Sequence, residues 1–209
     1  MDAIPLSALP SPAAPAFDPW LPNDDLLRVF DWRAIFCNAS PVEIELGAGD
    51  GGFILEYAAR HRQRNFVAVE RLKGRVGKIA KRAAQRGLAN LRALRLQSEY
   101  VIGRMCPPAS VSVIHIMFPD PWPKRRHFKH RLIQPAFLAA LSRALADGGT
   151  ARFTTDHAEY FQWTQKIWSA AAGWKNLGAW DADADPKSDF QRQFESEGKP
   201  SHRCQWQKI

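Results

Sequence analysis

The stretch Glu45-Leu46-Gly47-Ala48-Gly49-Asp50-Gly51-Gly52 decides the fold class of this chain. It overlaps the end of Val42–Leu46, where apolar residues alternate as in a half-buried strand, and it precedes Phe53–Arg62, which has the spacing of a helix. Glycines between a strand and a helix let the backbone turn sharply and approach a ligand closely, because no Cβ stands in the way. The sequence therefore predicts a strand–loop–helix unit that binds a nucleotide-like ligand.

Downstream of this unit, short β-rich runs alternate with helical patterns. Such alternation with short loops is typical of a parallel, doubly wound sheet with right-handed crossovers. We therefore expect an α/β, Rossmann-like fold with a mostly parallel seven-stranded sheet and helices on both faces. The further strands are expected at Asn65–Val69, Leu91–Leu96, Val111–Phe118 and Thr150–Thr154, and the further helices at Gly74–Arg86, Arg131–Ala146 and His157–Ala172. The tail from Trp174 to Ile209 is expected to supply the last strands, with Arg203–Lys208 as an edge strand.

The N-terminal residues differ from the rest in composition. Six prolines fall within the first 22 residues, with Ala and Ser between many of them. Residues 1–16 are therefore predicted to be a flexible Pro/Ala-rich arm, and residues 17–209 a single domain. Trp20–Asn38 is expected to pack beside this domain without joining its sheet.

Composition excludes several classes of protein. The chain has 209 residues, of which 45% are hydrophobic, which suits one domain with a packed core. No run approaches the ~18 apolar residues of a membrane span, and the first residues lack the basic region of a secretory signal. Cys37, Cys106 and Cys204 lie far apart, so we expect no disulfide, no metal site and a cytoplasmic location. The net charge of +8 is compatible with a nucleic-acid partner.

The glycines alone leave the bound ligand open. Gly47, Gly49 and Gly52 satisfy the dinucleotide pattern GxGxxG, whereas Gly47, Gly49 and Gly51 satisfy the GxGxG of methyltransferases. Glu45 favours the second pattern, because a carboxylate two residues before the first glycine would repel a pyrophosphate. S-adenosylmethionine instead carries a sulfonium and an ammonium group, and both favour a nearby carboxylate.

Two further polar residues fit the same cofactor. Glu70 ends the second expected strand, where a carboxylate can accept hydrogen bonds from both hydroxyls of a ribose. Gln97 follows the third expected strand, and we expect its amide near the adenine. The cofactor site is thus predicted at the carboxyl ends of the first three strands.

The stretch Phe118-Pro119-Asp120-Pro121-Trp122-Pro123-Lys124 directly follows the fourth expected strand. Two prolines fix the backbone around Asp120 and remove amide donors, so its carboxylate is held in a stiff loop. Trp122 offers a flat face on which an extruded base can stack. Five Lys/Arg and two His lie between Lys124 and Arg131. The cations of this run that we expect to contact RNA phosphates are Arg125, Arg126, Lys129 and Arg131.

At these residues the sequence resembles the bacterial tRNA (guanine-N7-)-methyltransferase family. That family places FPDPW-x-K-x-R-H after its fourth strand, and the match continues through Arg131–Phe137 and Thr155-Asp156. The resemblance covers roughly residues 42 to 208; the glycine loop is generic, but the FPDPW segment is highly specific. It implies the class I methyltransferase fold, S-adenosylmethionine as the cofactor, and methyl transfer to N7 of the variable-loop guanine (position 46) of tRNA.

The resemblance also assigns roles to individual residues. Asp120 matches the active-site acid of the family and also neighbours the cofactor. Lys124 and Asp156 match substrate-binding positions, and a C-terminal T-x-[YF]-E segment aligns best with Ser188-Asp189-Phe190-Gln191. The residues that match cofactor positions are Glu45, Gly47, Gly49, Glu70 and Gln97, and those that match substrate positions in the C-terminal segment are Ser188, Phe190 and Gln191.

Two residues depart from the family pattern. Gln97 stands where the family has Asp or Asn, and its amide can still hydrogen-bond to adenine. Gln191 replaces a Glu whose carboxylate accepts hydrogen bonds from the N1–H and amino group of guanine, whereas an amide has one donor face. Glu195 lies nearby in the sequence and could substitute for it.

Guanine N7 carries an in-plane lone pair and no proton, so the reaction needs alignment more than a base. We therefore interpret Asp120 as an orienting residue that stabilises positive charge growing on the guanine ring. Two alternatives stay open: a methyltransferase acting on another RNA atom such as an exocyclic amine, and a non-catalytic RNA-binding protein with this fold. The expected partner is tRNA, and the chain is expected to act as a monomer or homodimer without an obligate partner subunit.

Overall fold

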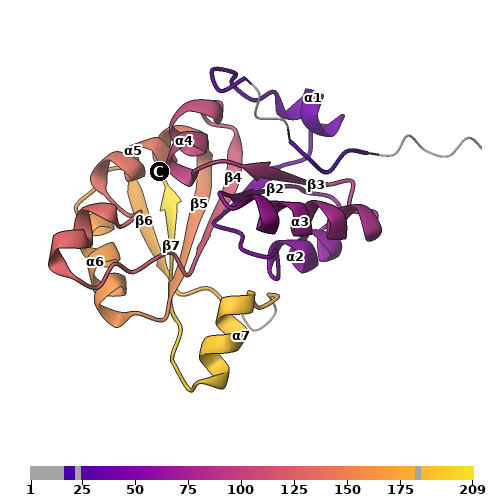
Figure 1. The fold of residues 1–209 in the computed structure, drawn as a ribbon. Coiled ribbons are helices and arrows are strands. Elements are labelled where there is room, and N and C mark those ends of the chain that lie inside the picture. The colour runs from indigo at the N-terminus through magenta and orange to yellow at the C-terminus, as the bar shows by residue number, and fades with distance from the viewer. Residues whose placement is uncertain (1–16, 22–24, 182–184) are drawn as a thin grey trace, which may run out of the picture.

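A single sheet of seven strands organises the computed structural model, which describes residues 17–21, 25–181 and 185–209. The strand order is β3-β2-β1-β4-β5-β7-β6 (Figure 1). The parallel strands are β1 (Val42–Leu46), β2 (Asn65–Glu70), β3 (Leu91–Arg95), β4 (Val111–Met117) and β5 (Leu145–Thr155), and the antiparallel pairs join β7 (His202–Lys208) to β5 and to β6 (Trp174–Gly178). The expected α/β class and mostly parallel seven-stranded sheet are confirmed. The expected N-terminal arm, residues 1–16, lies outside the described residues.

Helices cover both faces of this sheet. One face packs against α2 (Ile54–Arg60) and α3 (Lys73–Gln85), and the other against α5 (Pro135–Ala144), α6 (Ala158–Ser169) and a π-helical turn (Val101–Met105). The remaining helical segments are α1 (Trp32–Phe36), α4 (Ser98–Tyr100), a 3₁₀ segment (Arg125–His130) and α7 (Asp189–Ser196). Pro135 occupies the first turn of α5, where proline needs no amide donor, and the helix therefore begins later than the expected Arg131.

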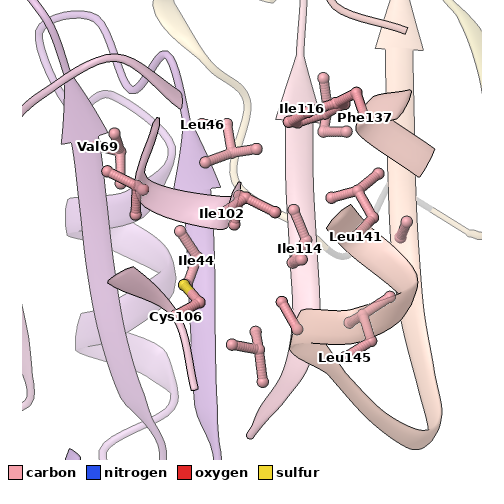
Figure 2. Close-up of a cluster of buried hydrophobic side chains, with 14 of the residues drawn as sticks. Ile44, Leu46, Val69, Ile102, Cys106, Ile114, Ile116, Phe137, Leu141 and Leu145 are labelled. Carbon is pink, nitrogen blue, oxygen red and sulfur yellow. The ribbon is translucent and has the colours of Figure 1, made fainter. Parts of the chain in front are cut away.

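The larger part of the core lies between β1, β4 and the helices at 101–105 and in α5 (Figure 2). Ile44 and Ile114 from the sheet pack there against Ile102 and Leu141. All five side chains of β1 are buried, although its sequence alternates as a half-exposed strand would. Its polar face, which carries Glu43 and Glu45, is covered by α2 instead of solvent, so the alternation distinguishes two buried faces.

The positions of two segments differ from expectation. The expected edge strand Arg203–Lys208 lies in the interior as β7, because it pairs with β5 on one side and with β6 on the other. Its Cys204 and Trp206 side chains are buried in the core. The strand at this edge of the sheet is β6. Trp20 was expected to stay outside the sheet, but it forms a parallel bridge with Ala93 through backbone hydrogen bonds on both sides.

The C-terminal tail contains a helix as well as the expected strands. Helix α7 begins at Ser188, whose hydroxyl accepts a hydrogen bond from the Gln191 amide. Figure 1 shows α7, in yellow, beyond the ends of the central strands. No helix in the described part of the chain is long and apolar enough to cross a membrane.

Candidate active site

A hollow of about 470 Å³ opens at the carboxyl ends of β1 to β4. Open parallel sheets bind ligands at this edge. Of the residues expected in the cofactor and substrate sites, those that line the hollow are Gly47, Glu70, Gln97, Asp120 and Phe190. The structure thus brings the residues expected to bind the cofactor and the loop expected to carry the catalytic Asp120 to one cavity.

The glycine loop, residues 47–52, follows β1, and its first residue, Gly47, lines the cavity. The two possible glycine patterns differ in whether Gly51 or Gly52 completes them. Gly51 has a φ of +86°, and a Cβ there would lie 2.9 Å from Leu55 and from Ile79. Gly52 is not left-handed, but its Cβ would lie 2.6 Å from the Asp189 carboxylate. Position 51 therefore requires glycine for the turn, whereas a side chain at position 52 would have to displace the Asp189 carboxylate.

Glu70 holds the glycine loop in place. One carboxylate oxygen accepts a hydrogen bond from the Gly49 amide at 3.1 Å, and the other accepts one from the Leu72 amide at 2.9 Å. Each oxygen of a carboxylate can accept a second hydrogen bond. The side chain is therefore oriented before any ligand binds, and it keeps acceptor capacity toward the cavity.

Glu45 lies beneath the glycine loop and is 2% exposed. Its Oε2 atom has no hydrogen-bond partner among the described residues. Burial raises the pKa of Glu45 well above its ordinary value, and the negative charges of Asp189 and Glu70 raise it further. A buried carboxylate without a cation is costly, so this arrangement fits a ligand that brings a positive charge.

The loop that carries Asp120 has an unusual backbone. Phe118 has a φ of +51° and Trp122 a φ of +44°, both in the left-handed region that bulky residues rarely adopt. Such strain persists only where the surroundings enforce it, and it is common at functional sites. The Phe118 amide donates to the Thr154 carbonyl at 2.8 Å, which fixes the start of the loop. Asp120 itself is exposed at the rim of the cavity.

The end of the loop is held by Arg131. Its side chain is fully buried, with Nε donating to the Pro121 carbonyl at 2.9 Å and Nη2 to Glu159 at 3.3 Å. The guanidinium carbon lies 3.6 Å from the centre of the Phe128 ring. Arg131 was expected to contact RNA phosphate, but its guanidinium is enclosed by aromatic rings and cannot reach solvent. It supports the loop instead.

Helix α7 reaches the cavity through aromatic contacts. Phe118 contacts Phe194 at a ring distance of 5.5 Å, and Phe194 is stacked with Phe190 at 6.3 Å. The Phe190 ring lies below the Arg75 guanidinium and faces Gly49, whose Cβ would be 3.7 Å away. The FPDPW loop, α7 and the glycine loop therefore form one packed unit around the cavity.

Other expected substrate residues lie away from the cavity lining. Ser188 and Gln191 are buried, and both stabilise α7: the first caps it, and the second donates from Nε2 to Glu195 at 2.8 Å. Lys124 is exposed and Asp156 partly exposed at the same edge of the sheet. The expected phosphate contacts Arg125, Arg126 and Lys129 are exposed on the 3₁₀ segment next to Trp122.

Two arginines and one histidine that the sequence does not predict in the site also line the cavity: Arg71, Arg75 and His130. Arg71 directly follows Glu70 in the sequence, so its position beside the cavity could have been inferred from the end of β2. Arg75 belongs to α3, and the ring centre of His130 lies 5.2 Å from that of Trp122. The cavity lining therefore carries three acids, Glu70, Glu99 and Asp120, together with the guanidinium groups of Arg71 and Arg75.

Known proteins resemble this chain in sequence. The methyltransferase family model Methyltransf_4 matches residues 39–204. A tRNA (guanine-N(7)-)-methyltransferase of Myxococcus xanthus is 37% identical over 180 residues, covering 83% of this chain and 86% of that protein. The protein of the same name from Halorhodospira halophila is 38% identical over 148 residues, covering 71% of this chain and 64% of that protein.

Solved structures share the fold at low sequence identity. The 16S rRNA methyltransferase KamB superposes with a TM-score of 0.62 at 20% identity, covering 87% of this chain and 97% of that chain. The antibiotic-resistance methyltransferase Kmr gives a TM-score of 0.58 at 16% identity, covering 87% and 94%. The fold is thus that of methyltransferases, and by its sequence this chain belongs to the tRNA (guanine-N(7)-)-methyltransferase family.

Proposed function

We propose that this protein transfers a methyl group from S-adenosylmethionine to N7 of a tRNA guanine, the one at position 46 in the variable loop. The observation that carries the proposal is the single cavity that joins the glycine loop and Glu70 to Asp120 and Phe190. Membership of the family supports the reaction and the substrate.

The residues at the glycine loop fit this cofactor. The buried Glu45, whose Oε2 atom has no hydrogen-bond partner among the described residues, suits the ammonium group of its methionyl part, and the pre-oriented Glu70 suits the two ribose hydroxyls. Gln97 is exposed at the cavity wall after β3, where its amide can hydrogen-bond to adenine. When bound, S-adenosylmethionine supplies an electrophilic methyl group.

Asp120 is proposed to orient the guanine and to stabilise the positive charge that develops on its ring. The strained backbone at Phe118 and Trp122, together with the Arg131–Pro121 hydrogen bond, keeps the carboxylate at a fixed place. A fixed charge stabilises a transition state without reorganising first. Trp122 is 36% exposed beside Asp120, and its ring can stack on the extruded base.

The RNA-binding side of the proposal rests on the exposed cations next to this loop. Lys124, Arg125, Arg126 and Lys129 lie shortly after Trp122 in the sequence. Phosphate contacts by such residues position a nucleic acid without reading its sequence. We propose that Phe190 and Asp156 contribute to the guanine-binding side of the site, and that Ser188 and Gln191 contribute to it indirectly by stabilising α7.

The test is methyl transfer by the purified protein to an unmodified tRNA transcript, followed by mapping of the product. N7-methylguanine is expected at one variable-loop position, and a transcript with adenine there should remain unmethylated. Methylation at an exocyclic amine would replace the N7 assignment by a different RNA methyltransferase. Binding of tRNA without methylation of any transcript would support a non-catalytic RNA-binding protein and would overturn the proposal.

A further inference from the structure

A row of five cations runs along one side of α3 and its flanks. We call Arg71, Arg75, Lys78, Arg82 and Arg86 the basic seam. Their spacings of four, three, four and four residues place neighbours on one helical face. Residues 71–86 contain no Asp or Glu, and all five seam residues are at least partly exposed.

The seam connects two hollows of the molecule. Arg71 and Arg75 line the catalytic cavity at one end. Arg82 and Arg86 line a second hollow of about 510 Å³ at the other end, between α2, α3 and residues 185–192. A helical rise of 1.5 Å per residue puts Arg75 and Arg86 about 16 Å apart along the axis. The seam is therefore a continuous positive path that leaves the catalytic cavity.

Few acids neutralise this path. Asp50 is shared by Lys78 at 2.8 Å and Arg75 at 3.8 Å, and Glu56 accepts from Arg86 at 3.4 Å. Among the described residues, the five cations of the seam thus form ion pairs with two carboxylates. These two carboxylates fasten α3 to the glycine loop and to α2, but they leave an excess of three positive charges.

The second hollow also has an excess of positive charge. Its charged lining consists of the cations Arg60, Arg82, Arg86, Lys187 and Arg192 and the acids Glu56, Asp185 and Asp189. Five cations against three acids leave two net positive charges in this lining, a count that shares Arg82, Arg86 and Glu56 with the seam. A concave positive surface focuses the field toward a negative ligand. Arginine, which predominates here, binds phosphate groups through two parallel hydrogen bonds.

We propose that the basic seam and the second hollow bind the phosphate backbone of the substrate tRNA, in a segment outside the loop that enters the catalytic cavity. This inference rests on the proposed function, since it requires that the ligand in the cavity is part of a tRNA. The seam begins in the cavity wall with Arg71 and Arg75, so a strand that leaves the bound guanine can reach it directly.

The test compares the salt dependence of tRNA binding between variants. The double variant Arg82→Gln/Arg86→Gln removes two seam cations that line the second hollow. Arg86→Gln alone leaves every contact of Asp50 in place. The matched control is Lys166→Gln/Lys175→Gln, which removes two exposed charges from α6 and β6, on the other half of the sheet. Binding of S-adenosylhomocysteine by each variant checks the glycine loop.

If the seam binds phosphate, the slope of log affinity against log salt should fall by about 0.7–0.9 for Arg86→Gln and twice that for the double variant. Over a fourfold change in salt concentration, the affinity deficit of the double variant should then change by about tenfold. The control should keep the wild-type slope, and it and Arg86→Gln should bind S-adenosylhomocysteine like the wild type. Arg82 donates a hydrogen bond to the Asp50 carbonyl of the glycine loop at 3.0 Å, so the single variant decides if cofactor binding weakens in the double variant.

Two results would overturn the inference in different ways. If the wild type methylates tRNA but both seam variants bind tRNA with the affinity and slope of the control, the seam is a solvated surface or serves an acidic protein. If the wild type neither binds nor methylates tRNA, the proposed function fails first, and the seam assignment fails with it.

Discussion

The Arg131 guanidinium, buried against Phe128, donates a hydrogen bond to the Pro121 carbonyl one residue after Asp120. Arg131→Gln should lower the free energy of unfolding by about 1.5–3 kcal/mol, because it removes hydrogen bonds made by a buried charged group. It should also lower kcat for tRNA more than it raises the tRNA Kd, since Asp120 loses its support. Arg131→Lys should fall between, because a lysine keeps the charge but not the planar fork.

Lys129→Gln is the matched control, since Lys129 is an exposed cation of the same 3₁₀ segment. It should change the free energy of unfolding by less than about 0.5 kcal/mol. Chemical denaturation and steady-state kinetics on the same preparations measure both effects. Wild-type stability and kcat in Arg131→Gln would show that the loop holds its shape without this contact.

Asp120→Ala should reduce kcat by roughly 10–100-fold, less than for a fully enclosed charge, because Asp120 lies at the exposed rim. The tRNA Kd should change little, since the interaction is made mainly in the transition state. Asp120→Asn should give an intermediate rate. Activity should also need no base that titrates near neutrality, because N7 has no proton to lose. A wild-type rate in Asp120→Ala with a defined tRNA would remove the active site from this loop.

Cofactor affinity should depend on the protonation of Glu45. Burial raises the pKa of Glu45 in the free protein, and an ammonium group would favour its charged form. Binding should therefore release a proton, and the affinity for S-adenosylhomocysteine should rise with pH by up to about one log unit per pH unit until the raised pKa is passed. Calorimetry in buffers of different ionisation enthalpy measures the released proton.

Two variants check this assignment of the proton. Glu45→Gln should weaken binding and abolish its pH dependence. Asp189→Asn should shift the plateau of affinity to lower pH, because Asp189 contributes to the raised pKa. A pH dependence that persists in Glu45→Gln would assign the proton to another group.

The buried pair of His115 and Glu43 should make stability sensitive to acid. His115 Nε2 lies 2.8 Å from Glu43, and burial lowers the pKa of His115 below its ordinary 6.5 despite this partner. The unfolded chain therefore takes up a proton below about pH 6.5 that the folded His115 does not. The free energy of unfolding should fall from that pH downward by at most about 1.4 kcal/mol per pH unit from this group. Denaturant titrations at a series of pH values measure the slope.

His115→Gln should lose this part of the pH dependence, whereas His130→Gln, at an exposed position, should keep it. The pKa of Glu43 adds a second effect at lower pH. Burial raises this pKa, but hydrogen bonds from His115 and Arg64 outweigh burial and bring it below 4.5. The stability that Glu43 contributes is therefore present above pH 4.5 and is lost as the pH falls through its folded pKa. An identical slope in both histidine variants would contradict the assignment to His115.

Charge reversal at Arg125 and Arg126 tests the expected phosphate contacts beside Trp122. The double change to Glu should weaken tRNA binding and lower the salt slope by about two units or less, since each contact contributes about one unit at most. Lys166→Glu/Lys175→Glu carries the same change of charge on α6 and β6 and should leave the slope unchanged. Intact affinity and slope in the first variant would mark the run as a solvated surface.

The central strands and the cavity could be predicted from the sequence because their signals are local. The apolar alternation of Val42–Leu46 and the glycines after it define a strand end, and the positions of Glu70 and Asp120 follow from the same rule at two other strands. Helix α7 was missed although Ser188 and Gln191 have the spacing of a capping box. The hydrophobic periodicity of Asp189–Ser196 consists only of Phe190 and Phe194, which is too short a signal.

The placement of Arg131 and β7 could not be predicted, because it depends on contacts between distant residues. Arg131 is enclosed by Phe128, Tyr160 and Trp163, and two of these rings belong to a helix nearly 30 residues further along the chain. A basic run in a sequence gives no indication of such a pocket. Likewise, the alternation in His202–Lys208 predicts a strand but not its neighbours, so interior and edge positions cannot be distinguished.

The interior position of β7 has a consequence for synthesis on the ribosome. Because β7 lies between β5 and β6, residues 174–178 have no partner in the sheet until residues 202–208 have left the exit tunnel. During that interval β5 presents an unpaired edge, next to a core in which Phe153 and Trp168 still lack Trp206. A nascent chain at this stage resembles an aggregation-prone sheet, and we expect it to bind a chaperone until its last strand is inserted.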